Sequence, residues 1–278
     1  MLDTLIPATS GEDRAIGQIP PVSGEERGKK PVLIVLHQEN SNPGHVGQWF
    51  VRHGYHLDIR KPRFGEPLPA TMADHCGVVI FGGPMSANDK DDFVRAEIEW
   101  LEVPLREKAP FLGICLGAQM LAVHLGAKVG FDPEDRAEIG YYPLTPTGSG
   151  MDFPDHVYQW HREGLELPGG AALLATSDGA YPNQAFSYGG SAFGVQFHPE
   201  ITFAQVHRWS GHNNTRLEMK GARERQQHID GHIMHGRKVQ GWLGGFLDSW
   251  VRGEFSAGRA ANVRMSSQRN TIATQDVL

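Results

Sequence analysis

Short apolar runs alternate with amphipathic stretches in the first half of the chain. The runs have the length and the Val, Ile and Leu content of strands buried on both faces, and the stretches between them repeat apolar residues at helical spacing. Predicted strands lie at residues 31–37, 55–60, 77–81 and 110–114, and predicted helices at 45–52, from Asp89 or Asp91 to about 101, and at 116–125. Strands that alternate with helices predict an α/β fold, with a mostly parallel central sheet and helices on both faces.

After Gly126 the pattern changes to short strand-like segments separated by turn residues. These segments lie at residues 139–144, 157–160, 172–176, 184–188 and 192–197. Gly189 and Gly190 join the last two and predict a hairpin, because glycine adopts positive φ without steric cost. We therefore expect a small antiparallel addition to the sheet. A long helical region follows at about residues 202–252, with residues 211–214 as a candidate interruption.

The two ends of the chain lack the apolar pattern of the middle. Residues 1–30 mix acidic and basic side chains without an apolar core, which argues against a signal or transit peptide. Residues 255–278 are similarly polar and rich in small side chains. We expect a flexible tail over residues 1–30, one domain over residues 31–254 and a second flexible tail over residues 255–278.

Composition and charge narrow the class of protein. A hydrophobic fraction of 40% and a charged fraction of 21% are typical of a globular domain, and no apolar run reaches the ~18 residues of a membrane span. The net charge of -6 argues against a nucleic-acid partner. Cys76 and Cys115 are too few for a disulfide framework, so we expect a reducing, cytoplasmic compartment. Because no apolar run is long enough to span a membrane, we expect no membrane association.

Cys115 is the first candidate for chemistry. It lies between Gly113 and Gly117, where a predicted strand meets a predicted helix, in the G-x-nucleophile-x-G pattern of a nucleophile elbow. The sharp turn exposes the side chain, and the helix N-terminus favours the thiolate. On this pattern alone, Cys115 is equally well explained as a small buried hydrophobic residue.

A histidine and a glutamate supply a second element. His198 and Glu200 follow the last predicted strand and flank Pro199. Side chains two apart on a strand point the same way, so both face one site if the extended geometry continues past Pro199. The carboxylate can then orient the imidazole, whose other nitrogen takes the thiol proton. A core histidine and a solvated glutamate are the alternative explanation.

The loop after the third predicted strand supplies a third element. It contains Gly82 and Gly83. Because parallel sheets bind ligands at the carboxyl ends of their strands, we expect this loop beside the elbow. The backbone N–H groups of Gly83 and Leu116 could then bind the oxyanion of a tetrahedral intermediate. Without the other two elements, a plain turn explains the glycines equally well.

Three motifs together carry a resemblance to a known family. FGGPMS at residues 81–86, GICLGAQMLA at 113–122 and GVQFHPE at 194–200 resemble, in this order and at these separations, the class I glutamine amidotransferases. The resemblance covers roughly residues 32–200. It implies a flavodoxin-like fold and the hydrolysis of glutamine to glutamate and ammonia, without a metal or cofactor.

The resemblance implies a role for each motif residue when the family's roles are carried over to the matching positions. Cys115 would form a γ-glutamyl thioester, His198 would act as base and then as acid, and Glu200 would orient it. Gly83 and Leu116 match the amides of the oxyanion hole. The implied substrate contacts are Gln119, Gly82, Gln159 and Trp160, the last two in a stretch that resembles the one closing over the substrate.

The resemblance leaves the physiological reaction open. The chain has no P-loop and is similar to the glutaminase domain of GMP synthase without the synthetase, so a separate ammonia-accepting synthase subunit is a candidate partner. A γ-glutamyl peptidase, which cleaves γ-glutamyl metabolites, would use the same thioester. A regulatory binding protein with low turnover is the third alternative, although the three triad residues are all present.

Other histidines are given no chemical role. His228, His232 and His235 fall at helical spacings that could place them on one face, but no cysteine or carboxylate cluster completes a metal site. A solvated polar face explains them better. Nothing at the position of His37, at the end of the first predicted strand, demands a chemical role.

Overall fold

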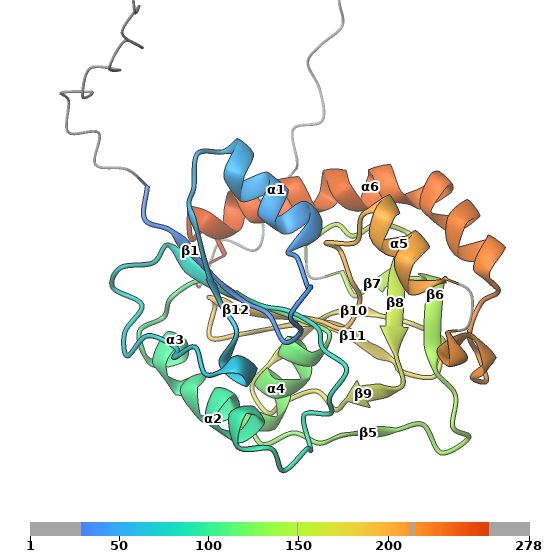
Figure 1. Ribbon diagram of the computed structural model, residues 1–278, viewed down its shortest axis with the longest axis horizontal. Helices are drawn as coiled ribbons and strands as arrows, with labels where there is room; N and C mark the ends of the chain where they lie inside the picture. The colour runs from blue at the N-terminus through green and yellow to red at the C-terminus, as the bar shows by residue number, and fades with distance from the viewer. Residues whose placement is uncertain (1–28, 149, 212–213, 256–278) are drawn as a thin grey trace, which may run out of the picture.

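Over the residues that the computed structural model describes (29–148, 150–211 and 214–255), the central sheet has eight strands (Figure 1). In spatial order they are β2 (Leu57–Arg60), β1 (Val32–Val35), β3 (Gly77–Ile80), β4 (Phe111–Ile114), β12 (Ala192–Val195), β11 (Asn183–Tyr188), β10 (Ala172–Thr176) and β7 (Thr145–Pro146). The first five are parallel, and the last three extend the sheet in antiparallel pairs. The predicted α/β class and its antiparallel addition are confirmed.

Helices cover both faces of this sheet (Figure 1). α1 (Gly44–Arg52) and α6 (Arg225–Val251) lie on one face, and α2 (Asp92–Trp100), α3 (Glu102–Arg106) and α4 (Leu116–His124) lie on the other. Alternate residues of β1 divide between the two cores. Val32 and Ile34 pack in the cluster of Phe50 from α1, whereas Leu33 packs in the cluster of Val94 from α2. A strand that is buried on both faces therefore has an uninterrupted apolar sequence.

Two small antiparallel sheets stand beside the central one. β5 (Val129–Phe131) pairs with β9 (Glu163–Leu165), and β6 (Glu138–Pro143) pairs with β8 (His156–His161). The hairpin predicted at Gly189 and Gly190 joins β11 to β12, and the two glycines have φ of 60° and 78°. The hairpin thus returns the chain to the centre of the sheet, next to β4.

The long helical region predicted at residues 202–252 is interrupted over more residues than expected. It consists of α5 (Phe203–Trp209), the 3-10 helix η2 (Thr215–Glu218) and α6. The connection between η2 and α6 bonds to the edge of β6, because the Ala137 N–H donates to the Lys220 carbonyl and the Arg223 N–H to the Ile139 carbonyl. These sheet-like bonds replace helical ones, so the interruption extends well beyond residues 211–214.

Two further expectations concern α2 and the ends of the chain. Asp91 occupies the N-cap position of α2 without a side-chain bond to the helix, and Asp89 instead accepts the Ser86 N–H at 2.9 Å, so neither aspartate caps the helix. A short 3-10 turn, η1 (Pro62–Phe64), follows β2. The predicted tails lie almost entirely outside the described residues. Within the described part, no helix is long and apolar enough to cross a membrane.

Candidate active site

Cys115 stands at the sharp turn between β4 and α4. Its backbone has φ of 51° and ψ of -103°, a conformation that residues other than glycine rarely adopt. The Cys115 N–H donates to the carbonyl of Val195 in β12 at 2.8 Å, and the Cys115 carbonyl accepts from the Gln119 N–H at 3.0 Å. The nucleophile elbow expected from the glycine pattern is therefore the local geometry of the chain.

The two glycines around Cys115 are required by close backbone contacts. A Cβ atom added to Gly113 would lie 2.5 Å from the carbonyl carbon of Gly117. A Cβ atom added to Gly117 would lie 2.2 Å from the carbonyl oxygen of Ile80 in β3. Because these neighbours are backbone atoms of the central sheet and of α4, they cannot turn aside as a side chain could.

Replacing Gly117 with alanine should therefore destabilise the protein by about 1–3 kcal/mol, the usual cost of overpacking a well-packed core. The free energy of unfolding in urea measures this change. Gly130→Ala is the matched control, since no atom of the described residues lies within 4 Å of a Cβ added to Gly130. Equal stability of the two variants would contradict the close packing of the elbow.

A turn, and not an extended strand, brings His198 and Glu200 together. β12 ends at Val195, and the Ile201 N–H donates to the His198 carbonyl at 3.5 Å. The condition under which both side chains were predicted to face one site, extended geometry past Pro199, is therefore not met. The outcome for the side chains is nevertheless the expected one, because Nδ1 of His198 lies 2.8 Å from Oε1 of Glu200 and both side chains are buried.

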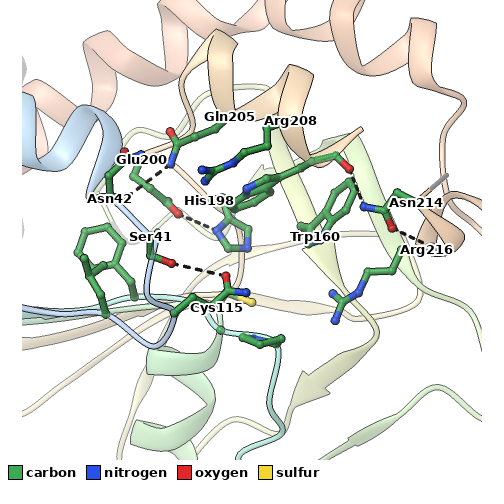
Figure 2. A pocket seen from close by; sticks show the side chains of 17 residues that line it. Ser41, Asn42, Cys115, Trp160, His198, Glu200, Gln205, Arg208, Asn214 and Arg216 are labelled. Atoms are coloured by element: carbon green, nitrogen blue, oxygen red, sulfur yellow. Dashed lines mark hydrogen bonds and ion pairs between the residues drawn. The ribbon is translucent and has the colours of Figure 1, made fainter. Parts of the chain in front are cut away.

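The His198 ring is held between its partner and the nucleophile. Trp209 packs edge-on against the ring at 5.1 Å, and a Cβ added to Gly82 would lie 2.8 Å from Cε1 of His198 and 3.4 Å from Cβ of Cys115. Figure 2 shows Glu200, His198 and Cys115 in succession along one cavity. Burial disfavours the imidazolium, but Glu200 and Cys115 outweigh it and raise the pKa of His198 to about 10.

Two adjoining cavities meet at Cys115. The first, of about 280 Å³, extends along the His198 side, and the second, of about 120 Å³, extends along α4. Residues that line both are Gly83, Pro84, Cys115, Trp160 and Arg216. The first continues to Gln205 and Arg208, whereas the second carries the charged side chains of Asp89, Arg162 and Glu163.

The predicted substrate contacts reach the cavities unequally. Gly82 lines the first cavity and Trp160 lines both. Gln119 lines the second, where its Nε2 donates to the Glu163 carbonyl at 2.9 Å. Gln159 lines neither cavity, because it is fully buried and its Nε2 donates to Oε1 of Gln184 at 2.6 Å.

The predicted oxyanion-hole residues lie beside Cys115. Leu116 is the first residue of α4, so its N–H has no carbonyl one turn earlier within the helix. Side-chain atoms of Leu116 pack near Gly83, since a Cβ added to Gly83 would lie 3.0 Å from Cδ2 of Leu116. The loop after β3 and the start of α4 are therefore neighbours, as the topology of a parallel sheet predicts.

Arg216 is a candidate site residue that the sequence patterns did not identify. It belongs to η2 and points toward the cavity in Figure 2. Its guanidinium has no ion pair among the described residues, and burial lowers the pKa of Arg216 while the nearby Cys115 opposes this change. The only sequence pattern near it was the break in the helical region, which does not indicate a direction for the side chain.

The histidines of α6 do not converge on one metal site, and the predicted solvated face is wrong for His228, which is fully buried against the Tyr158 hydroxyl. His235 instead lies with Asp155 and His156, with one ligand atom of each within 4.8 Å of the others. The imidazole rings of His156 and His235 stack with centroids 4.2 Å apart and an angle of 16° between their planes. Their in-plane lone pairs are therefore nearly parallel and do not converge on one metal ion. Lys238 also lies 3.3 Å from the Asp155 carboxylate, and none of these residues lines either cavity.

Comparisons with known sequences identify the family and several relatives of the chain. Residues 46–209 match the family model of glutamine amidotransferase class-I. The glutamine amidotransferase-like protein YfeJ of Salmonella typhimurium is 32% identical over 199 residues, which cover 67% of this chain and 82% of that protein. The glutamine-hydrolyzing GMP synthase of Porphyromonas gingivalis is 37% identical over 142 residues, which cover 48% of this chain and 26% of the synthase.

Solved structures share the same fold. A glutamine amidotransferase of Thermotoga maritima superposes with a TM-score of 0.71 and 32% identity, covering 80% of this chain and 97% of its own. A glutamine amidotransferase of Methylobacillus flagellatus gives a TM-score of 0.74 at 24% identity, covering 81% of this chain and 95% of its own. At that identity the second likeness concerns the fold alone.

Proposed function

This chain belongs to the class I glutamine amidotransferase family, and on that premise we propose that it hydrolyses the side-chain amide of glutamine to glutamate and ammonia. The observation that carries the proposal is the alignment of a strained Cys115 with a buried His198 whose Nδ1 is held by Glu200 at 2.8 Å. Nε2 of His198 has no hydrogen-bond partner among the described residues and is left for the reaction.

The proposed reaction proceeds through a thioester on Cys115. The thiolate attacks the amide carbon, and the N–H groups of Gly83 and Leu116 stabilise the oxyanion. The C–N bond then breaks, and ammonia leaves with a proton from Nε2 of His198. The same nitrogen next takes a proton from water as the water oxygen bonds to the acyl carbon; the C–S bond then breaks, which releases glutamate and restores the thiolate beside the protonated ring.

The second cavity suits the α-amino and α-carboxylate groups of an amino acid. It carries the carboxylates of Glu163 and Asp89 together with the guanidinium of Arg216. Oε1 of Glu163 is held by the Ser86 hydroxyl at 2.8 Å, which orients the carboxylate. We assign the α-ammonium to the acidic side chains and the α-carboxylate to Arg216, since charged hydrogen bonds of this kind are the strong ones.

Arg216→Gln should raise the KM for glutamine roughly 10- to 100-fold, because a hydrogen bond to a charged group contributes about 1.5–3 kcal/mol. Steady-state kinetics with glutamine measure the change. Arg208→Gln is the matched control, because Arg208 lines only the first cavity and donates to the Asn40 carbonyl at 3.5 Å. A larger rise in KM for the control than for Arg216→Gln would reverse the assignment of the two cavities.

A second candidate reaction is the cleavage of γ-glutamyl compounds. It is favoured by the first cavity, which extends from His198 to Gln205 and Arg208 on the side where the leaving amine must receive its proton. A leaving group larger than ammonia would occupy this space. If glutamine is the substrate, we propose that a synthase subunit accepts the ammonia, because one of the relatives is a glutamine-hydrolyzing GMP synthase.

An electrophilic glutamine analogue tests the proposed function at the level of the nucleophile. Incubation with a chloroketone analogue should add one label to the protein, on the peptide that contains Cys115, and excess glutamine should slow the labelling. Mass spectrometry of the intact and digested protein measures both. Labelling that glutamine does not slow would contradict a glutamine site at Cys115.

A further inference from the structure

A buried ion pair lies behind the glycine loop of the active site. His37 follows β1 and Glu97 belongs to α2, and the side chains of both have 0% exposure to solvent. Nε2 of His37 lies 3.0 Å from Oε1 of Glu97, while Oε2 of Glu97 has no hydrogen-bond partner among the described residues. A buried charge pair with an unsatisfied oxygen is costly to keep, so a role beyond packing is worth testing.

The other ring nitrogen of His37 reaches the glycine loop. Nδ1 lies 3.2 Å from the carbonyl oxygen of Gly82. His37 lines neither cavity, whereas Gly82 and Gly83 line the cavity in front of Cys115. The Gly82 carbonyl is therefore drawn to the side of the loop that faces away from the cavity.

The direction of that carbonyl fixes the direction of the next N–H. Gly82 O and Gly83 N–H belong to one peptide, and no cis peptide occurs among the described residues. In a trans peptide the C=O and N–H bonds point to opposite sides. A carbonyl held by His37 on the far side consequently turns the Gly83 N–H toward the cavity.

We propose that the His37–Glu97 pair is a positioning device for the oxyanion hole, which holds the Gly82–Gly83 peptide with its N–H directed at the substrate oxygen. The inference rests on the proposed role of Gly83. A peptide between two glycines has no Cβ to restrict it and can rotate readily, so an external hold on its orientation is needed. A preformed hole costs no reorganisation during the reaction.

The charge of Glu97 keeps the ring in the form that can donate to the carbonyl. Burial disfavours protonation of His37, but Glu97 and the Gly82 carbonyl outweigh it and raise the pKa of His37. With both nitrogens protonated, one donates to Glu97 and the other to Gly82. Glu97 thus acts through His37 and touches no reacting atom.

Two substitutions at Glu97 separate positioning from packing. The amide of Glu97→Gln can donate to Nε2 of His37, which keeps the neutral ring in the tautomer whose Nδ1 donates to the Gly82 carbonyl, whereas Glu97→Leu has a similar size and cannot. We expect Glu97→Leu to lower kcat for glutamine roughly 10- to 100-fold. Complete loss of an oxyanion-hole donor lowers kcat by about 10²- to 10³-fold, and this variant would misdirect the donor without removing it. Glu97→Gln should retain most of the activity, and KM should change less than about threefold in both.

His37→Phe removes the donor itself and should lower kcat at least as much as Glu97→Leu. The matched control is His75→Phe, because His75 also forms an ion pair, 2.9 Å from Asp58 and partly buried, and lines neither cavity. That control should leave kcat unchanged. If His37→Phe does not fold, the comparison of Glu97→Leu with Glu97→Gln decides the question alone.

Two probes of Cys115 make the test specific to the oxyanion hole. Glutamate γ-semialdehyde forms a tetrahedral hemithioacetal, in which the thiol sulfur bonds to the aldehyde carbon and the oxygen becomes the oxyanion or hydroxyl. Its affinity should fall in Glu97→Leu in proportion to kcat. The rate of alkylation by iodoacetamide, which needs no oxyanion hole, should stay within about twofold.

The outcomes distinguish this inference from the proposed function. Normal semialdehyde affinity and kcat in Glu97→Leu would overturn the positioning role while leaving the glutaminase proposal intact. Equal losses in semialdehyde affinity and iodoacetamide rate would also overturn it, because they indicate general damage to the site. A wild-type protein that hydrolyses no γ-glutamyl substrate would instead contradict the proposed function itself.

Discussion

Replacing Cys115 with alanine should abolish the release of ammonia from glutamine, with kcat lower by a factor on the order of 10³ or more. No other nucleophile among the described residues stands at the elbow between the two cavities, so water would have to attack the amide directly. Quantification of ammonia and glutamate after a fixed incubation measures the loss. Alanine lacks only the sulfur atom of cysteine and must adopt the same positive φ at this turn, so the fold should be retained.

The second cysteine provides the matched control for this prediction. Cys76 is half-buried, lines neither cavity, and has a thiol pKa that burial raises to about 11. Cys76→Ala should therefore hydrolyse glutamine as the wild-type protein does. Retained activity in Cys115→Ala, or its loss in Cys76→Ala, would remove Cys115 as the nucleophile.

His198→Ala should lower kcat nearly as much as Cys115→Ala, on the order of 10³-fold, because the thiol loses its base and the leaving ammonia loses its proton donor. The initial rate of glutamine hydrolysis measures this effect. Replacement of the exposed His56, which lines neither cavity, is the control and should have no effect. A His198→Ala protein with more than a tenth of wild-type activity would contradict the assignment.

Glu200→Gln should retain partial activity, with a smaller loss than Cys115→Ala or His198→Ala, since the amide can still orient the ring but carries no charge. The pH profile adds a second readout. Glu200 raises the pKa of His198, so its loss lowers that pKa. Activity that needs the imidazolium falls as pH rises through this pKa, so the alkaline fall should occur at lower pH in the variant. An unchanged alkaline limb would argue against His198 as the proton donor.

Local patterns predicted the parts of the site that depend on local geometry. The glycines around Cys115 predict the elbow because backbone contacts to Ile80 and within α4 exclude any larger residue. Gly189 and Gly190 predict the hairpin because positive φ is required at both. In these cases the residue type and the backbone geometry imply each other, and no distant contact has to be known.

Features set by distant contacts were not predictable in the same way. Gln159 and Trp160 were both expected at the substrate, but adjacent residues of a strand point to opposite faces, and only Trp160 reaches the cavities. Arg216 enters the site because the chain before α6 bonds to the edge of β6. His37 acquires a partner only when α2 packs against the sheet and brings Glu97 to its ring.

The central claim is that the protein cleaves a γ-glutamyl bond at Cys115. Its most direct test is the release of ammonia from glutamine, measured beside the release of glutamate from γ-glutamyl peptides, with wild-type protein and Cys115→Ala in parallel. We expect equimolar ammonia and glutamate from glutamine with the wild-type protein and neither product with the variant. Wild-type protein that is inert toward both glutamine and γ-glutamyl peptides would contradict the enzyme assignment and favour a binding protein that keeps the fold.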